Sequence, residues 1–376
     1  METTNGIRLS KSTIRWIGVG LFVSSSILII ISVFSGVSFS DLTKLGYLPF
    51  ALAAIVSSAK LLVQVVRFRT IVNGFAGDSK PDLGGVAIAR MGSEFVALST
   101  PSMVGGEFMR AAWLSGKGVV GGKALWIGYF EVVVDVYVSS ALGLLSAAYA
   151  FSRGATVIAS TILVIVSLLV VGYSIFFLVP AFRGVPKIPR RLFRFAGLFI
   201  GGPRAARLEK AVQEGSVNFS LAARAILKKE ALPTILYALG LTVIQALLSG
   251  VALWVILRAA GLNIDLFSAT LVAYGATAIA ALPISIGGSG LTELAVAAYL
   301  STVYGFTSWA AVVLWRIASF QVVLAVTGVA FLLLVHKATR TNPKNPRSPT
   351  EEGKSRTQIA TVFSSSPPCP VIDTPS

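Results

Sequence analysis

Two stretches of this sequence repeat one pattern of helix-breaking residues. Residues 100–107 read TPSMVGGE and residues 283–293 read PISIGGSGLTE, so each stretch holds Pro-x-x-x-Gly-Gly with a glutamate shortly after it. A mostly apolar arm (83–99 or 266–282) precedes each stretch, and a shorter arm (106–115 or 291–300) follows it. Because proline removes a backbone donor and glycine permits a sharp bend, we expect two helices that are each broken at this pattern.

The position of these breaks indicates a function. Irregular backbone survives inside a bilayer only where protein or a water-filled cavity covers it. Paired Gly and Pro interruptions in matching positions of two halves point to the central site of a transporter. We therefore expect the two breaks to meet. The residues expected to form them are Pro101, Gly105, Gly106, Pro283, Gly287, Gly288 and Gly290.

The composition is typical of a membrane protein with many spans. Of 376 residues, 55% are hydrophobic and 13% charged, and the mean hydropathy is +0.79, whereas soluble domains carry about 25% charged residues. The net charge of +16 gathers in loops between apolar spans, which indicates anionic lipid headgroups at the cytoplasmic face and not nucleic acid. Cys369 and His336 are single and lie outside the spans, so we expect no disulfide, metal or other cofactor.

The predicted fold is an all-α polytopic membrane protein with six full transmembrane helices and two re-entrant broken helices. A short arm of about ten residues covers about 15 Å, half of a hydrocarbon core of about 30 Å. Full crossings by the broken helices would also place the strongly basic loop 181–230 outside. We therefore expect them to turn back from opposite leaflets, as an inverted repeat of residues 47–150 and 231–335. The full crossings are expected at residues 16–37, 47–66, 124–150, 155–179, 231–257 and 308–335.

Both ends of the chain are expected on the cytoplasmic side of the cell membrane. Residues 1–15 are polar and basic, and the transmembrane domain is expected to fill residues 16–340. The loop 181–230 mixes cations with aromatic and aliphatic residues, which is typical of an interfacial helix on an anionic leaflet, with a solvated connector as the alternative. The tail, residues 341–376, is polar and rich in proline and is expected to be disordered.

Nine ionisable residues fall inside apolar stretches, where a central charge costs about 3 kcal/mol. They must therefore be paired, neutralised or hydrated in a cavity. Arg90 and Glu94 are four residues apart, and Glu107 and Arg110 are three apart, so each pair is spaced to meet on one helix face, with helix capping as the alternative for the second pair. The nine are Lys60, Arg90, Glu94, Glu107, Arg110, Glu131, Asp135, Glu293 and Arg316.

Glu131 and Asp135 project from one face of their span, where two like charges either share a proton or await a cation. Arg316 lies in the corresponding span of the second half. The matched helices therefore suit a central ion-pair network or an anionic headgroup held by arginine. Lys60 lies near one end of its expected span, so that snorkelling to the interface is the alternative to a central role.

Two motifs carry a resemblance to a known family. Residues 100–110 read Thr-Pro-x-x-x-Gly-Gly-Glu-x-x-Arg, and Glu131-x-x-x-Asp135 follows in the next helix. This pattern resembles the transmembrane region of lysylphosphatidylglycerol synthases and related flippase-like proteins. The second motif of that family, Pro-Gly-Gly-x-Gly-x-x-Glu, is similar to residues 286–293, although Ile286 stands in place of the proline. The resemblance covers about residues 10–340, with Arg67 and Arg316 fitting the pattern as well.

The resemblance implies translocation of a lipid with a polar, often charged, headgroup between leaflets, or association with envelope glycolipid assembly. The bifunctional synthases also carry a soluble domain that transfers an aminoacyl group. We expect no such domain here and therefore no enzymatic aminoacyl transfer.

The residues leave several functions open. The leading hypothesis is a flippase-like transporter whose partners are membrane lipids, with a phosphate received by one of the central arginines. The alternatives are a membrane-embedded transferase with an acidic general base, a transporter of a small ion or solute, and a scaffold or homo-oligomer that serves an envelope enzyme. The predicted binding residues are Glu107, Arg110, Glu131, Asp135, Glu293 and Arg316, and we predict no catalytic residue.

Overall fold

A computed structural model describes residues 11–77, 81–100, 105–184, 202–282 and 285–340. In these residues the chain is all-helical and contains no strand. The helices run as α1 Lys11–Phe34, α2 Phe39–Lys44, α3 Tyr47–Phe75, α4 Leu83–Leu98, α5 Gly106–Gly116, α6 Gly121–Ser152, α7 Thr156–Phe182, α9 Gly202–Ala225, α10 Leu232–Ala259, α11 Leu266–Ala280, α12 Leu291–Tyr304, α13 Trp309–Arg316 and α14 Val322–Arg340.

Within the described residues, five helical stretches are long and apolar enough to cross a membrane. They are Tyr47–Phe75, Gly121–Ser152, Thr156–Phe182, Lys229–Ala259 and Trp309–Lys337. The remaining expected crossing, residues 16–37, corresponds to α1, whose apolar part Phe22–Phe34 is shorter than these five stretches. A polytopic helical protein is therefore confirmed, whereas the count of six plus two and the inverted repeat stay predictions.

One predicted boundary is wrong. The second span was expected to end at Val66, before Arg67, but α3 continues without interruption to Phe75. The reason is that Arg67 is fully buried inside the bundle and does not face the membrane surface. An arginine that is paired internally does not end a transmembrane helix.

The two predicted breaks fall where helices end. The first segment is interrupted between α4 and α5, and the second between α11 and α12. Gly105, Gly287, Gly288 and Gly290 all have positive φ, which glycine adopts without steric cost. Gly106 begins α5, and a Cβ there would lie 2.8 Å from the Ser93 carbonyl oxygen of α4. Pro101 and Pro283 lie outside the described residues.

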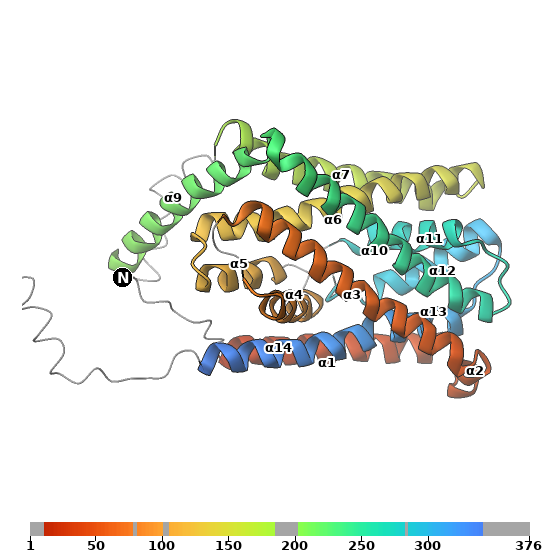
Figure 1. The fold of residues 1–376 in the computed structure, drawn as a ribbon. Coiled ribbons are helices and arrows are strands. Elements are labelled where there is room, and N and C mark those ends of the chain that lie inside the picture. The colour runs from red at the N-terminus through yellow and green to blue at the C-terminus, as the bar shows by residue number, and fades with distance from the viewer. Residues whose placement is uncertain (1–10, 78–80, 101–104, 185–201, 283–284, 341–376) are drawn as a thin grey trace, which may run out of the picture.

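The breaks touch each other in the centre of the bundle. The amide of Gly287 donates a hydrogen bond to the carbonyl oxygen of Thr100, with an N···O distance of 3.4 Å. In Figure 1, α5 lies toward the end of the bundle that also carries α9, whereas α11 and α12 lie toward the opposite end. The two broken segments, which are far apart in the sequence, therefore approach their contact from opposite ends of the bundle.

Both broken segments begin with the same helix cap. Asp82 precedes α4 and accepts a hydrogen bond from the Gly85 amide at 2.7 Å, and Asp265 precedes α11 and accepts one from the Ser268 amide at 3.0 Å. The Gly85 amide holds the pKa of Asp82 below its usual value, and the Ser268 hydroxyl and amide do the same for the pKa of Asp265. Each carboxylate therefore stabilises the positive end of its helix as an anion.

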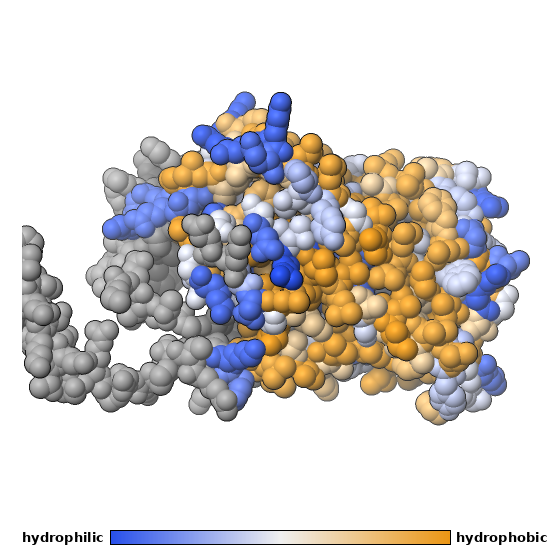
Figure 2. Space-filling view, in the orientation of Figure 1, coloured by the Kyte–Doolittle hydropathy of each residue, from blue (hydrophilic) through white to orange (hydrophobic). Residues whose placement is uncertain are grey.

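The surface supports a position within a membrane. Figure 2 shows a broad apolar surface over the length of the bundle, with hydrophilic residues gathered toward its ends. On α7, Val157, Leu168 and Phe176 are all largely exposed. An apolar side chain in these positions is stable in contact with lipid acyl chains.

The basic loop is helical in its second part. Helix α9 occupies Gly202–Ala225 and packs against α6 and α7. A Cβ at Gly122 of α6 would lie 2.1 Å from the Gly215 carbonyl oxygen of α9, so these two backbones approach closely. The expectations for residues 1–10, 185–201 and the tail 341–376 lie outside the described residues.

Candidate functional site

A cavity of about 560 Å³ lies where the two breaks meet. Leu98 and Gly288, from the two broken segments, line it, and helices of both halves form its walls. Seven of the described residues that line it are acidic or basic, which is unusual within an apolar bundle. They are Lys60, Arg90, Glu94, Glu107, Arg110, Asp135 and Arg316.

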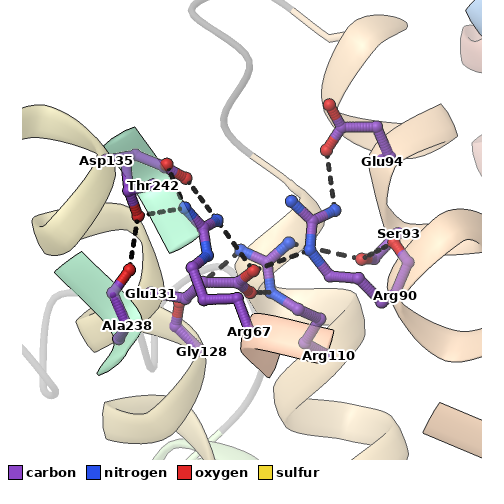
Figure 3. A network of polar contacts seen from close by, with 10 residues as sticks. All are labelled: Arg67, Arg90, Ser93, Glu94, Arg110, Gly128, Glu131, Asp135, Ala238 and Thr242. Atoms are coloured by element: carbon purple, nitrogen blue, oxygen red, sulfur yellow. Dashed lines mark hydrogen bonds and ion pairs between the residues drawn. The ribbon is translucent and has the colours of Figure 1, made fainter. Parts of the chain in front are cut away.

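Glu131 is the centre of the larger charged cluster, shown in Figure 3. Its carboxylate is 1% exposed and contacts three guanidinium groups from three helices. Arg67 of α3 lies 2.9 Å away, Arg90 of α4 lies 2.7 Å away, and Arg110 of α5 forms an ion pair at 3.1 Å without hydrogen-bond geometry. Glu131 therefore ties the first broken segment to α3 and α6.

Asp135, one turn along α6, shares a partner with Glu131. Arg67 forks onto both oxygens of Asp135, donating at 2.7 Å to Oδ2 and at closer range to Oδ1. It also donates to the hydroxyl of Thr242 on α10 at 2.8 Å. The prediction that two like charges share a proton or await a cation is thus resolved, because the cation is the guanidinium of Arg67.

The predicted pair of Arg90 and Glu94 is confirmed at 2.7 Å. Arg110 additionally lies 3.3 Å from the Ser93 hydroxyl and 3.5 Å from the Gly128 carbonyl oxygen. The cluster holds three cations and three carboxylates, so its charges balance, and pairing offsets the cost of burying each. Its members are Arg67, Arg90, Arg110, Glu94, Glu131 and Asp135.

The second half carries its own smaller cluster. Arg316 donates to Glu293 at 3.0 Å and to the carbonyl oxygen of Gly287 at 2.8 Å. Its guanidinium also stacks 4.0 Å from the ring centroid of Phe320, which lies in the π-helical turn that follows α13. Arg316 therefore fixes the second break, and Glu293, not Glu131, is its acidic partner.

The glutamate after each break caps the short arm. Glu107 accepts from the Gly105 amide at 3.3 Å, and Glu293 accepts from the Gly290 amide at 2.8 Å. Among the described residues no ion pair joins Glu107 to Arg110, so the predicted pairing on one helix face is wrong and the capping alternative holds. Arg110 pairs instead with the carboxylate of Glu131, which is more buried than that of Glu107 and therefore gains more from a counterion.

Several polar groups of the cavity have no partner in the part of the chain that the structure describes. Lys60 lies near the middle of α3 and lines the cavity, with no carboxylate within 4.0 Å. Snorkelling is therefore not its role. Gln64 Oε1, Gln245 Oε1 and Trp315 Nε1 are buried, lack a hydrogen bond and belong to residues that line the same cavity. Buried groups of this kind are normally satisfied by protein, water or a ligand.

Sequence reasoning missed part of this site. Arg67 was expected to follow the end of a span and to fit the family pattern, but it was not among the predicted binding residues, because its separation from Glu131 and Asp135 along the chain gives no local signal. Gln64 and Gln245 were not considered. The available signal was periodicity, because Ser57, Lys60 and Gln64 follow the i, i+3, i+7 spacing of one polar helix face on an apolar helix.

The charged side chains that the structure describes do not form a metal centre. Within the described ranges no group of three His, Cys, Asp or Glu residues could hold a metal ion. The buried carboxylates are instead occupied by arginines. What the arrangement offers is a charge-lined cavity whose walls also include Val136, Leu169 and other apolar side chains.

One comparison with known proteins identifies the family of this chain. The family model described as the lysylphosphatidylglycerol synthase TM region matches residues 15–327. A search of curated proteins gives no match. The matched residues contain both breaks, both charged clusters and the whole cavity lining. The chain is therefore an all-helical membrane protein that belongs to the lysylphosphatidylglycerol synthase transmembrane region family.

Proposed function

We propose that this protein moves a lipid with a polar or charged headgroup between the leaflets of a membrane, with the headgroup passing through the central cavity. The observation that carries the proposal is the cavity itself, which lies where the two helix breaks touch and is lined by charged side chains. Its volume of about 560 Å³ lies within the range of 300–1,000 Å³ that is usual for small-ligand sites.

The unpartnered groups of the cavity favour a ligand with an anionic group and hydrogen-bond donors. Lys60 and Trp315 can donate to a phosphate, and the amide oxygens of Gln64 and Gln245 can accept from hydroxyl or ammonium groups. Apolar wall residues can contact the start of the acyl chains. A phospholipid or a phosphate-bearing glycolipid carries all three features.

The alternatives of an ion site or a general base receive less support. Both need an acidic side chain that is free to bind a cation or a proton. Glu131 and Asp135 are each engaged by at least one arginine, and Glu107 is engaged by the Gly105 amide. Carboxylate oxygens that already accept from arginines or from a backbone amide are less available to an added cation or to a substrate proton.

The test is lipid scrambling in reconstituted vesicles, with headgroup-labelled lipids and a membrane-impermeant quencher. The wild type is compared with Lys60→Met, which removes the ammonium without leaving a carboxylate unpaired. Lys44→Met is the matched control, because Lys44 is 71% exposed at the edge of the bundle. A lost charged hydrogen bond of about 1.5–3 kcal/mol corresponds to at least about tenfold slower movement in Lys60→Met.

Three headgroups separate the outcomes: an anionic phospholipid, a zwitterionic phospholipid and a neutral glycolipid. Movement of at least one of them above the protein-free rate is expected for the wild type. If the wild type moves none of them, the proposed function is wrong. If Lys60→Met and Lys44→Met move lipid equally fast, Lys60 takes no part in the path.

A further inference from the structure

A second cavity, of about 330 Å³, lies away from the central one, between α3, α6 and α9. Its polar lining consists of the side chains of Lys123, Trp126 and Asn218, and none of the described residues that line it carries a carboxylate. The central cavity, in contrast, contains cations and carboxylates together. A lining with donors and one net positive charge favours an anion.

The donors of this cavity are not used elsewhere in the described structure. Trp126 is fully buried and its Nε1 has no hydrogen-bond partner, although buried tryptophan N–H groups usually find one. Its ring is fixed by Phe75 and Phe130, whose ring centroids lie 4.9 Å and 5.2 Å away. Lys123 makes no ion pair in the described ranges, and the Asn218 amide makes no hydrogen bond there.

The helix that carries Lys123 and Trp126 also favours an anion in this cavity. Helix α6 begins at Gly121, and the cavity is lined by the N-cap residue Val120 and by Lys123 of the first turn. The free amides and the positive end of the helix dipole therefore lie beside it. Helix N-termini with an adjacent cation are common binding sites for phosphate groups.

The remaining wall is apolar and reaches the surface. Phe75, Leu221, Ala222 and Ala225 line the cavity, and Leu221 and Val120 are both more than half exposed. A free phosphate ion would gain nothing from this wall. A phospholipid would place its headgroup among the donors and its glycerol and upper acyl chain against the apolar side chains.

We propose that this second cavity binds the phosphate headgroup of an anionic membrane lipid, which holds α9 against α3 and α6. Lys123 supplies the charge, and Trp126 and Asn218 supply neutral hydrogen bonds. This site is separate from the transport path, and its occupancy does not depend on the proposed translocation. Binding there stabilises the folded bundle, because a ligand that binds only the native state raises its stability.

The test measures lipid binding to the full-length protein in detergent by native mass spectrometry, together with the Tm. Phosphatidylglycerol is the probe, and phosphatidylcholine and inorganic phosphate are the comparison ligands. For Lys123→Met we expect the Kd for phosphatidylglycerol to rise about tenfold or more, and the lipid-induced rise in Tm to disappear. Lys117→Met is the matched control, since Lys117 is exposed at the end of α5 and does not line the cavity.

Trp126→Phe is the second variant, because it removes the N–H donor and keeps an aromatic ring between Phe75 and Phe130. It also removes one ring of the indole, so the Tm of the lipid-free variant is measured first, and phosphatidylglycerol binding should be weaker at a temperature where this variant is folded. Equal Kd values for Lys123→Met, Trp126→Phe and the Lys117→Met control would overturn the proposal. So would equal stabilisation by phosphatidylcholine, or by inorganic phosphate at the same concentration. Lys60→Met should retain this binding, which separates the result from any failure of the transport proposal.

Discussion

Replacing Glu131 with glutamine removes the charge that three arginines share. The three cations and three carboxylates of the cluster balance in the native protein. Glu131→Gln leaves one positive charge uncompensated at a place where the side chain is 1% exposed. The glutamine also presents an amide nitrogen to guanidinium groups that can only donate. We therefore expect a large loss of stability from a change that barely alters the shape of the side chain.

The size of this loss follows from the pairing. Removing one partner of a buried ion pair costs about 3–5 kcal/mol, since it leaves a buried charge without a counterion. Glu131 contacts guanidinium groups at 2.9, 2.7 and 3.1 Å, so the upper part of this range is expected. At about 2 °C per kcal/mol, a loss of about 4–5 kcal/mol lowers the Tm by about 8–10 °C. Such a loss is a large fraction of a total stability of about 5–15 kcal/mol.

The assay is thermal unfolding in detergent, followed by tryptophan fluorescence. Glu214→Gln is the matched control, because Glu214 is exposed and its ion pair with Lys210, at 3.8 Å, should contribute less than about 1 kcal/mol. The double variant Arg110→Met with Glu131→Gln restores the balance of charge, and should be more stable than the sum of the two single losses implies. A fall in Tm of less than 2 °C for Glu131→Gln, or strictly additive losses, would refute the reasoning.

Three further substitutions test other contacts. Gly287→Ala places a Cβ 2.5 Å from the Leu98 carbonyl oxygen at a residue with φ +57°, so it should separate the breaks, lower the Tm and slow lipid scrambling together. Glu107→Gln retains an acceptor for the helix cap, so its Tm should stay within about 2 °C of the wild type while lipid scrambling slows. A fall in Tm as large as that of Glu131→Gln would contradict the assignment of Glu107 as a cap. Gly122→Ala should loosen α9, seen as faster proteolysis of α9, because its Cβ would lie 2.1 Å from a backbone oxygen.

The sequence was sufficient for those features that depend on local pattern. Apolar runs located the long helices, and the repeated Pro and Gly pattern located both interruptions. The spacing of Arg90 and Glu94 predicted their ion pair, since four residues along one helix bring side chains together. The contact between the breaks was also expected, because irregular backbone in a bilayer needs cover.

The sequence was insufficient for pairing between distant segments. Arg67 and Arg110 both meet Glu131, and Arg316 meets Glu293, through packing that no spacing along the chain encodes. The expectation that the second span ends before Arg67 was wrong for the same reason. Arg67 pairs with Glu131 and Asp135 inside the bundle, and a paired arginine does not end a transmembrane helix. The second cavity was not anticipated, since it forms only when α9 packs against α6.

The most direct test of the central claim is to obstruct the cavity and follow lipid movement. In a Cys369→Ser background, Ser249→Cys places a thiol on the cavity wall, and Ser152→Cys places one on the exposed surface as the control. Each variant is labelled with a negatively charged methanethiosulfonate, and the extent of labelling is measured by mass spectrometry before scrambling is assayed. The account predicts that labelling of Ser249→Cys stops lipid movement and that labelling of Ser152→Cys does not. Full labelling of Ser249→Cys with lipid movement at the unlabelled rate would contradict a path through this cavity.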